Sequence, residues 1–388
     1  MVLMVNFLKY LYVEKQMNKL RRIAIYLPQF HPIPENDEWW GKGFTEWTNV
    51  TKAQPRFKEH YQPHLPSELG FYDLRLSESR LAQEALAKEH DIYGFCYYHY
   101  WFNGKRLLNE PLDRKLVNEK EDLPFMLCWA NENWTRAWDG TDQQILIKQN
   151  YSEQDDRAHI KHLIQCFKDP RYIKVNGKPV FIFYKPDLLP DVRRTVEIFR
   201  EEASMEGLEL YLCWFERWIG WQGAGYESTG LDAAIEFQPL SKSLQSYLKT
   251  IKLNSAPKSV FNQRLLKLKS RIYKKLKLTL PLNDLVIDYR AFVDFDLSKD
   301  RKKLTYKCFP CVCPMWDNSS RRVNQNAIIF KGSNPDIFRK WITEMSNNFT
   351  PYSDQENLIF INAWNEWAEG NHLEPCQKWG RKYLEALK

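Results

Sequence analysis

Eight short hydrophobic runs recur along the chain, and amphipathic stretches separate most of them. The runs are rich in β-branched and aromatic residues, which is typical of buried strands. The intervening stretches repeat their apolar residues every three or four positions, as surface helices do. The predicted strands span residues 22–30, 92–101, 124–132, 179–186, 208–216, 231–239, 309–317 and 357–366, and the clearest helices span 77–90, 153–169 and 334–349.

Strands that alternate with helices predict an α/β protein with a parallel sheet, and eight such units favour a (β/α)8 barrel. An open, doubly wound sheet is the rival. It would need a glycine-rich phosphate turn, and the sequence contains no G-x-G-x-x-G or G-x-x-x-x-G-K motif. We therefore expect one barrel domain at residues 21–388 with a loop-rich C-terminal face, an N-terminal extension at 1–20 and a basic helical insert at about 240–283.

Each predicted strand begins with apolar residues and ends in polar or aromatic ones. In a barrel all eight carboxyl ends meet on one face, where barrel enzymes keep their active sites. The pattern therefore predicts a catalytic face rather than eight unrelated loops. The strand-end residues are Gln29, His31, His99, Trp101, Asn131, Glu132, Asn133, Tyr184, Lys185, Glu216, Arg217, Glu236, Gln238, Trp316, Asp317, Asn365 and Glu366.

The last predicted strand leads into NAWNEWAEG, residues 362–370, in which Glu366 and Glu369 stand among tryptophans. Carboxylates exchange protons in glycosidic chemistry, and indole rings stack on the C–H faces of sugars. A sugar site is therefore one interpretation of this loop. The other is a loop whose glutamates face water and whose tryptophans cover the core. Gly370 would allow the sharp turn that brings both glutamates to one sugar.

Five segments, in order, resemble the WbsX-type family, which comprises glycosyltransferases of bacterial surface-polysaccharide loci and is related to glycoside hydrolase family 99. The resemblance runs from about residue 21 to the end of the chain. It implies a (β/α)8 barrel that needs no metal and, in the hydrolase relatives, retaining endo-α-mannosidase activity. The segments are YLPQFHPIPENDEWWGKGFTEWTNV (26–50), YGFCYYHYWFNGKRLL (93–108), CWANENWTRAWDG (128–140), CFPCVCPMWDNSSRR (308–322) and FINAWNEWAEGNHLEP (360–375).

The resemblance also implies roles for the two glutamates. The catalytic pair of the hydrolase relatives lies in an E-W-x-E motif, which Glu366 and Glu369 match. In those relatives the first glutamate is the base on the sugar 2-hydroxyl, which gives a 1,2-anhydro intermediate. The second is the general acid and afterwards the base. This chain departs from the hydrolases at Ala368, where they often have histidine, so the catalytic class and the linkage stay open.

Other polar and aromatic residues near the strand ends are candidates for binding the substrate. If Glu366 is not the base, Glu132 or Glu216 is the replacement, whereas Glu374 is expected to be a structural or rim carboxylate. For every contact candidate, simple packing or a loop hydrogen bond is the alternative. We assign substrate contacts to Tyr26, Glu46, Trp47, Tyr98, His99, Trp129, Asn131, Glu132, Trp134, Glu216, Trp316, Asp317, Arg321 and Asn365.

Composition supports a large folded domain with an aromatic cleft. The 388 residues are 44% hydrophobic, and 15 Trp and 20 Tyr exceed what a core needs. No stretch approaches the roughly 18 consecutive apolar residues of a membrane span. Residues 1–20 are interrupted by Lys9, Glu14 and Lys15 and lack a small-residue cleavage site, so a secretory signal is not expected, and Met17 is an alternative start.

The positive charge is concentrated in one segment. Residues 237–282 contain eleven Lys and Arg and no Asp or Glu, and removing these cations from the net charge of +7 leaves −4. Apolar residues interleave with the cations, so we expect residues 249–278 to dock on anionic lipid headgroups. A solvated excursion is the alternative. Nucleic acid is not expected as a partner, because no nucleic-acid-binding fold accompanies the segment.

The eight cysteines are scattered, and five of them lie inside predicted strands. This pattern suits reduced core thiols in the cytoplasm better than a disulfide framework. Cys308, Cys311 and Cys313 could imitate a metal site, but two of them share one strand face and no matching Cys or His pair follows. We expect no metal and no other cofactor.

These observations lead to one hypothesis and two alternatives. The hypothesis is a cytoplasmic enzyme of bacterial surface-polysaccharide (O-antigen-like or capsule-like) synthesis, peripheral to the inner leaflet. It would transfer glycosyl groups at α-linked, mannose-like sugars of a glycan or lipid-linked oligosaccharide. The first alternative is a retaining endo-α-mannosidase-like hydrolase. The second is a glycan-binding barrel without activity, against which the intact pair Glu366 and Glu369 argues.

Overall fold

The computed structural model describes residues 20–136, 141–220, 225–255, 283–322 and 326–388. The expected N-terminal extension therefore lies outside the described residues except for Leu20, as does most of the expected basic insert. Leu20 packs against the hydrophobic core, directly before the first strand. The boundaries expected for these two segments stay predictions.

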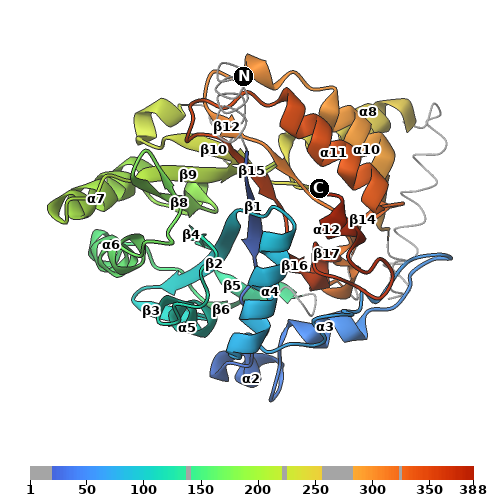
Figure 1. Ribbon diagram of the computed structural model, residues 1–388, viewed down its shortest axis with the longest axis horizontal. Helices are drawn as coiled ribbons and strands as arrows, with labels where there is room; N and C mark the ends of the chain where they lie inside the picture. The colour runs from blue at the N-terminus through green and yellow to red at the C-terminus, as the bar shows by residue number, and fades with distance from the viewer. Residues whose placement is uncertain (1–19, 137–140, 221–224, 256–282, 323–325) are drawn as a thin grey trace, which may run out of the picture.

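The core of the molecule is a ring of parallel strands in chain order (Figure 1). Neighbouring strands pair in parallel from β15 through β1, β2, β4, β8 and β9 to β10. All eight predicted strands are present, so the predicted (β/α)8 barrel is confirmed. The barrel strands are β1 (Arg21–Tyr26), β2 (Gly94–Phe102), β4 (Phe125–Trp129), β8 (Lys178–Phe183), β9 (Tyr211–Glu216), β10 (Ala233–Glu236), β12 (Cys308–Phe309), β13 (Cys311–Val312) and β15 (Leu358–Ile361).

One interrupted strand closes the ring. β12 pairs with β10, and β13 pairs with β15, so residues 308–312 join the two ends of the sheet. Pro310 separates the two halves, because proline has no N–H with which to continue a ladder. Its carbonyl still accepts a hydrogen bond from the Phe360 N–H at 2.9 Å. The closure therefore survives a proline in the strand.

Helices cover the outside of the ring (Figure 1). The three helices predicted most clearly correspond to α4, α6 and α11. Side-chain caps start two of them: Ser152 accepts a hydrogen bond from the Asp155 N–H, and Asn334 accepts from two backbone N–H groups. The helices are α2 (Pro34–Trp40), α3 (Glu46–Lys52), α4 (Ser77–Glu89), α5 (Glu110–Leu116), α6 (Glu153–Phe167), α7 (Val192–Met205), α8 (Lys242–Ser255), α10 (Tyr289–Leu297), α11 (Pro335–Asn348) and α12 (Lys382–Glu385).

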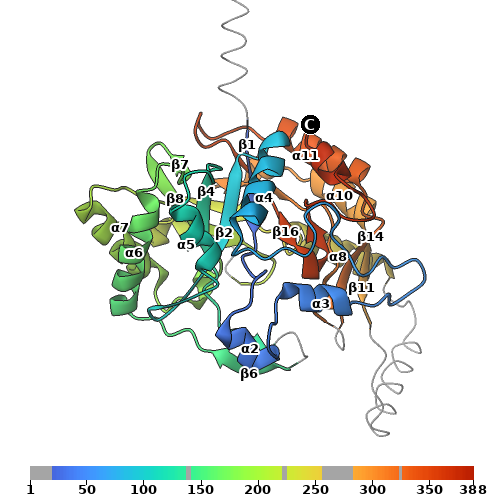
Figure 2. The same cartoon turned by 60° about the horizontal axis from the view of Figure 1, so that its bottom comes forward.

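Short strands form pairs within the segments that connect the barrel strands. Figure 2 shows α2, α3 and β6 together at one end of the molecule, beyond the carboxyl ends of the barrel strands. This arrangement is the loop-rich face that the strand endings predict. The pairs are β5 (Trp134–Arg136) with β6 (Thr141–Ile147), β11 (Leu285–Asp288) with β14 (Ile328–Lys331), and β16 (Asn365–Glu366) with β17 (Asn371–His372), while β3 (Lys105–Leu107) and β7 (Lys174–Val175) extend β2 and β8.

The core contains the thiols that the sequence places in strands. All eight cysteines are buried, and none is joined in a disulfide. Cys96 and Cys128 lie in β2 and β4, where burial raises the pKa of each thiol well above its ordinary value. Both thiols are therefore protonated and serve as small apolar core groups.

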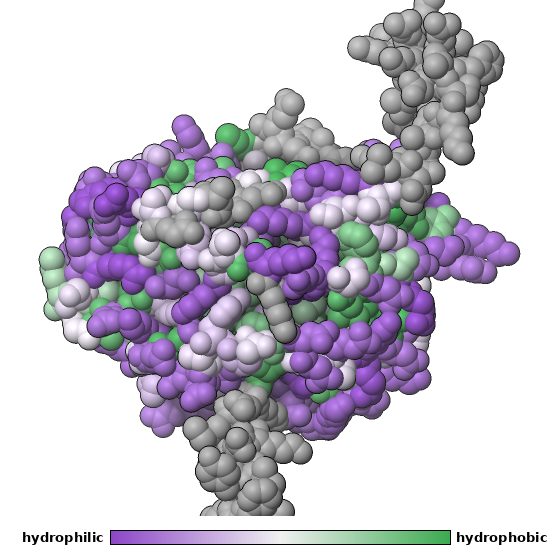
Figure 3. Space-filling view, turned by 90° about the horizontal axis from the view of Figure 1, so that it is seen from above, coloured by the Kyte–Doolittle hydropathy of each residue, from purple (hydrophilic) through white to green (hydrophobic). Residues whose placement is uncertain are grey.

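Among the described residues, no helix combines the length and the hydrophobicity that crossing a bilayer requires. On the face drawn in Figure 3, hydrophilic residues dominate and hydrophobic ones are scattered among them. Of the basic segment, α8 is described only to Ser255, and Lys249, Thr250 and Ile251 are exposed. Docking of residues 249–278 on lipid stays a prediction.

Gly94, the first residue of β2, marks a tight point of the barrel. A Cβ at this position would lie 2.4 Å from the Pro124 carbonyl oxygen and 2.9 Å from Ile173 Cδ1. Because backbone and a packed side chain both stand in the way, we expect Gly94→Ala to lower the free energy of unfolding by about 1–3 kcal/mol. Chemical denaturation measures the loss, and an unchanged midpoint would show that the strands can separate at no cost.

Candidate active site

The loop after β15 carries Glu366 and Glu369 through a tight turn. Glu366 ends β16, a 3-10 turn spans Trp367–Glu369, and Gly370 reverses the chain into β17. Gly370 has φ 54°, and a Cβ there would lie 2.9 Å from Asp317 Cβ. Both the backbone conformation and the close approach therefore require glycine. The turn aims both glutamates at the same neighbour.

That neighbour is Arg321. Its guanidinium binds Glu366 Oε2 through Nη2 at 3.0 Å and Glu369 Oε1 through Nη1 at 2.9 Å. Nη2 also binds Glu46 Oε2 at 3.1 Å. The side chains of Glu46 and Glu366 are 0% and 6% exposed, whereas that of Glu369 is 22% exposed. One cation thus holds three carboxylates, two of them removed from solvent.

The charges in this cluster do not balance. Burial, together with the charges of Glu369 and Glu46, raises the pKa of Glu366 to about 8, against the lowering effect of Arg321. Burial likewise raises the pKa of Glu46 in spite of Arg321. Burial tends to lower the pKa of Arg321, but the three carboxylates raise it well above its ordinary value. The guanidinium is therefore charged at neutral pH, while Glu366 retains its proton.

A cavity of about 220 Å3 opens beside the cluster. It lies at the carboxyl ends of β1, β2, β4 and β8, and its lining combines aromatic rings with polar side chains. Trp134 stacks on Tyr100 and Phe102, with ring centroids 5.4 and 6.1 Å apart. The lining consists of Leu27, Gln29, Tyr98, Tyr100, Phe102, Ala130, Glu132, Asn133, Trp134, Thr135, Tyr184, Phe237, Leu240, Trp316, Arg321, Glu366 and Glu369.

The family model for Glycosyltransferase WbsX matches residues 22–387. The chain belongs to this family. The "Uncharacterized protein WxcX" from two strains of Xanthomonas campestris pv. campestris is 38% identical over 371 residues, which are 94% of this chain and 49% of that protein. The chain thus spans about half the length of the curated relatives it matches. The resemblance inferred from the five segments is confirmed.

Solved structures share the fold at low identity. A glycoside hydrolase-like protein superposes with a TM-score of 0.56 at 13% identity, covering 96% of this chain and 93% of that one. The GH99 endo-α-mannosidase from Bacteroides thetaiotaomicron superposes with a TM-score of 0.52 at 12% identity, covering 95% of each chain. At these identities the similarity concerns the barrel and not the reaction. This WbsX family member therefore shares the barrel fold of these two proteins.

The structure brings part of the predicted site together. The two glutamates of the predicted pair and five of the predicted contacts line the one cavity. Glu132 stands at its edge, partly exposed and paired with Lys185. Trp316 is almost fully buried and presents its ring to the cavity wall. The predicted residues in the cavity are Tyr98, Glu132, Trp134, Trp316, Arg321, Glu366 and Glu369.

Three predicted contacts point away from the cavity because side chains alternate along a strand. The Tyr26 hydroxyl donates to Gln83 of α4 at 2.7 Å, on the helix side of the barrel. His99 packs against His159 of α6, with 3.0 Å between their Nε2 atoms. Trp129 also contacts His159, at a centroid distance of 4.6 Å. All three belong to the packing between the barrel and its helices.

The other predicted contacts support the loops rather than line the cavity. Glu46 lies behind Arg321, as described above. Asn131 donates to the Lys185 carbonyl and accepts from the Lys185 N–H. Asn365 makes the same pair of hydrogen bonds with the backbone of Leu27. The Trp47 indole donates to the Tyr72 carbonyl at 2.9 Å. Glu216 pairs with Lys242 at 2.6 Å, and Asp317 pairs with His60 at 2.6 Å, both outside the cavity.

Glu374 is a structural carboxylate, one of the two roles expected for it. It is buried and accepts from Trp367 Nε1 at 2.6 Å, the Tyr72 hydroxyl at 2.8 Å and Gln83 Nε2 at 2.6 Å. Burial raises the pKa of Glu374 to about 7 against these donors. Its bond to Trp367 anchors the residue between Glu366 and Ala368, so Glu374 helps to hold the loop that carries the glutamate pair.

Several residues that line the cavity were not predicted from the sequence. Tyr100 and Phe102 continue the inward face of β2 that begins at Tyr98, two and four residues further on. Applying the period of two to that strand would have found them. Gln29 lines the cavity and donates to the Tyr100 hydroxyl at 2.8 Å. Phe237 follows β10, and only the closed barrel brings it here.

Among the described residues, no three His, Cys, Asp or Glu side chains come together as metal ligands. Cys308, Cys311 and Cys313 each lie buried in or beside the strand that closes the barrel. They therefore act as core thiols in the described structure.

Arg321→Gln should make stability more sensitive to pH. The unfolded chain releases the Glu366 proton near its ordinary pKa of about 4.3, whereas the folded chain holds it to about pH 8. The stability contributed by this group therefore falls as pH rises between those values. Removing the guanidinium raises the folded pKa further, so the loss in free energy of unfolding should be larger at pH 9 than at pH 6, by about 1.4 kcal/mol per pKa unit.

Arg321→Lys is the matched control, since it keeps the charge and should show a smaller difference between the two pH values. Denaturant titrations at both pH values measure the effect. Equal losses at pH 6 and pH 9 for Arg321→Gln would mean that the guanidinium does not control the protonation of the cluster.

Proposed function

We propose that this WbsX family member transfers glycosyl groups at α-linked, mannose-like sugars in bacterial surface-polysaccharide synthesis, with Glu366 and Glu369 as its catalytic pair. The observation that carries the proposal is the shared guanidinium: both glutamates bind Arg321 and face one aromatic-walled cavity. Family membership supports glycosyl transfer, and the fold is shared with an endo-α-mannosidase. The substrate would be a glycan or a lipid-linked oligosaccharide on the cytoplasmic side of the membrane.

Glu366 is suited to act as a general base at a site that is removed from solvent. Its ionised form is stabilised by Arg321 and destabilised by burial, and the balance puts its pKa at about 8. In the proposed reaction, ionised Glu366 takes the proton of the sugar 2-hydroxyl. The resulting O2 attacks C1 from the face opposite the leaving group and forms a 1,2-anhydro sugar.

Glu369 is suited to proton transfer at the other face. As the more exposed member of the pair, it can meet an oxygen that enters from solvent or from a second glycan. When Glu366 is ionised, the proton of the pair is on Glu369, which gives it to the leaving oxygen as the C1–O bond breaks. It then takes a proton from the acceptor hydroxyl, which attacks C1, while Glu366 returns its proton to O2. Configuration at C1 is retained because two inversions occur.

The cavity walls supply the binding surfaces that this chemistry needs. Trp134 and Trp316 present apolar faces for sugar C–H groups, and Tyr98, Tyr100 and Tyr184 border the same space. Burial raises the pKa of Tyr98 and Tyr100 well above the ordinary value, so their hydroxyls are protonated at neutral pH. The proposed substrate contacts therefore combine stacking with uncharged hydroxyl groups.

Hydrolysis is the second candidate, because only the acceptor differs. If water replaces the acceptor hydroxyl, the same two proton transfers give a retaining endo-α-mannosidase-like reaction. Glu369 is partly exposed, so it can be reached both by water and by the hydroxyl of a second glycan. Products decide between the two: incubation with α-mannosides, and separately with sugar nucleotides and a lipid-linked acceptor, followed by mass spectrometry. A protein that binds glycans and yields no product in either assay would be a binding barrel.

Glu366→Gln and Glu369→Gln should each lower turnover by about 100-fold or more, since general acid–base catalysis supplies at least that factor. The amide keeps the shape of the side chain but cannot exchange the proton, so the melting temperature and glycan binding should change little. The product assays above measure turnover, and thermal denaturation measures folding.

Two further variants address the alternative bases. Glu132→Gln, inside the cavity, should change KM more than kcat, and Glu216→Gln, outside it, should leave turnover intact. Near-normal rates in both pair variants, together with a loss in one of these two, would transfer the chemistry to the other carboxylate.

The pH profile of the wild-type protein should show a descending limb of kcat/KM with a midpoint near pH 8, the pKa of Glu366. The reason is that the proposed reaction needs one proton in the pair, which Glu369 carries while Glu366 acts as the base, and the pair loses this proton above pH 8. The ratio kcat/KM reports such pKa values of the free enzyme. In Glu366→Gln this limb should be absent from the residual rate. A wild-type profile that stays flat through pH 8 would contradict the assignment of Glu366 to the pair.

A further inference from the structure

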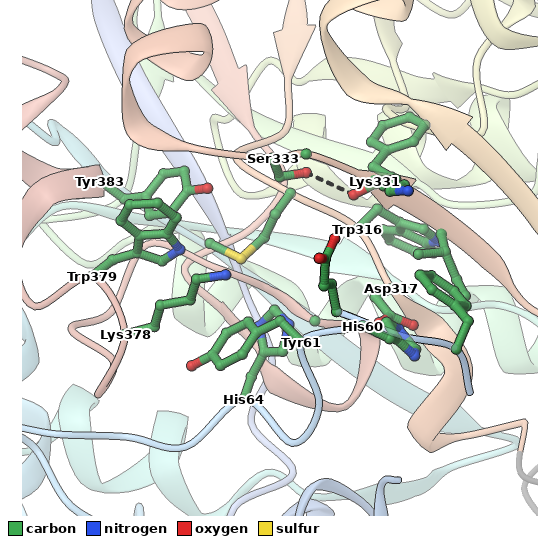
Figure 4. Close-up of a pocket in the computed structure, with 17 residues that line it drawn as sticks. His60, Tyr61, His64, Trp316, Asp317, Lys331, Ser333, Lys378, Trp379 and Tyr383 are labelled. Carbon is green, nitrogen blue, oxygen red and sulfur yellow. Dashed lines mark hydrogen bonds and ion pairs between the residues drawn. The ribbon is translucent and has the colours of Figure 1, made fainter. Parts of the chain in front are cut away.

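A second cavity of about 260 Å3 lies on the other side of Trp316 (Figure 4). Segments far apart in the sequence form it: residues 57–64, 315–317, 329–333 and 378–383, with Gly370. We call this space the side pocket. It is smaller than the roughly 300–1,000 Å3 of sites for drug-sized ligands, so its capacity suits a single ring.

A thin partition separates the side pocket from the catalytic cavity. Trp316 lines both spaces. The next two residues of the partition are consecutive in the chain: Glu369 lines the catalytic cavity, and Gly370 lines the side pocket. Asp317 belongs to the same partition, since its backbone N–H donates to the Glu369 carbonyl at 2.7 Å. A ligand in the side pocket would therefore lie against the back of the loop that carries the catalytic pair.

Aromatic rings form opposite walls of the side pocket. Figure 4 shows Trp379, Tyr383 and Tyr61 on one side and Trp316 on the other. The Lys378 ammonium lies 4.3 Å from the centroid of Tyr61 and 5.1 Å from that of Trp379, and in Figure 4 it points into the space between the walls. Such walls offer faces on which a flat, partly apolar ring can stack.

The charged groups around the side pocket cancel. Lys331 and Lys378 face Glu59 and Asp317 in its lining. The Arg56 N–H donates to His60 Nδ1 at 2.9 Å, so the ring proton is on Nε2, which donates to Asp317 at 2.6 Å, and His60 is neutral. Burial lowers the pKa of His64 to about 4, so this ring is neutral as well. A polyanion such as a nucleoside diphosphate would therefore meet no net positive charge here.

The polar atoms of the side pocket include both donors and acceptors. Lys378 and the Tyr383 hydroxyl can donate, and the carboxylate of Asp317 can accept. The Tyr383 hydroxyl is buried and makes no hydrogen bond to any residue that the structure describes. An unsatisfied buried hydroxyl costs free energy unless a ligand or water completes it. Sugar hydroxyls both donate and accept, so one pyranose ring matches the walls and the polar groups together.

We propose that the side pocket is a binding site for one neutral pyranose unit of a glycan, separate from the catalytic cavity. The ring stacks on Trp379 and Tyr61, and its hydroxyls bind Lys378, Asp317 and Tyr383. The inference does not depend on the catalytic roles proposed for Glu366 and Glu369. A second site of this kind would hold a glycan chain beside the loop that carries the pair.

The test uses the full chain and a panel of methyl α-pyranosides (mannoside, glucoside and galactoside), with binding followed by saturation-transfer NMR. Trp379→Ala should weaken binding at the side pocket by about tenfold, and Trp134→Ala is the matched control for the catalytic cavity. Trp379→Ala should retain binding at the catalytic cavity, and Trp134→Ala should retain binding at the side pocket. The variant that carries both substitutions should bind at neither site. Lys378→Met, at an exposed position, removes the ammonium group from the side pocket and keeps its aromatic rings.

Melting temperatures show whether each variant is folded. Binding that Trp134→Ala abolishes and that Trp379→Ala and Lys378→Met leave intact would overturn the proposal. A second result would also overturn the proposal. The protein would bind uridine diphosphate or orthophosphate, but no pyranoside, and Lys378→Met would weaken that binding. Either result leaves the proposed catalysis standing, since that proposal depends on the turnover of the Glu366 and Glu369 variants.

Discussion

A single buried guanidinium, that of Arg321, holds together the loops at the carboxyl ends of the barrel strands. It binds Glu46 at the start of α3 and Glu366 and Glu369 from the loop after β15, while Arg321 itself follows β13. One cation cannot neutralise three carboxylates in a site that excludes water, so a proton remains on Glu366 up to about pH 8. The arrangement keeps one proton within the glutamate cluster, and it makes the position of each loop depend on the others.

The loops around Arg321 are fixed by neighbours that take no part in the reaction. Glu374 anchors Trp367, and the Ser320 hydroxyl donates to the Ala368 carbonyl, so the residues between the two glutamates are held from both sides. Asn365 brackets the backbone of Leu27 at the end of β1. These contacts hold a loop that is rich in polar groups and almost fully buried, because they pair several of its donors and acceptors within the protein.

The partition formed by Trp316, Asp317 and the Glu369–Gly370 turn gives the face two compartments rather than one. Its thinness results from Gly370, where any side chain would collide with Asp317. A shift of this turn would move Glu369 on one side and the wall of the side pocket on the other. The side pocket and the cavity that Glu369 lines are thus separated by only a few residues.

The sequence by itself determined the barrel, the family and the loop with the glutamate pair. Strands and helices follow from local periodicity, and the segment around Glu366 carries its chemistry within a few residues. It did not determine which polar residues share the cavity. Tyr26, His99 and Trp129 were chosen by residue type, but alternation along each strand turns them toward the helices.

Only the tertiary structure decided that Glu46 and Arg321, 275 residues apart, bind each other, and that residues 57–64 and 378–383 meet across Trp316. The protonation of Glu366 likewise depends on burial and on charges brought in by distant loops. Such contacts leave no periodic trace in the chain, because closure of the barrel, and not local propensity, brings these residues together.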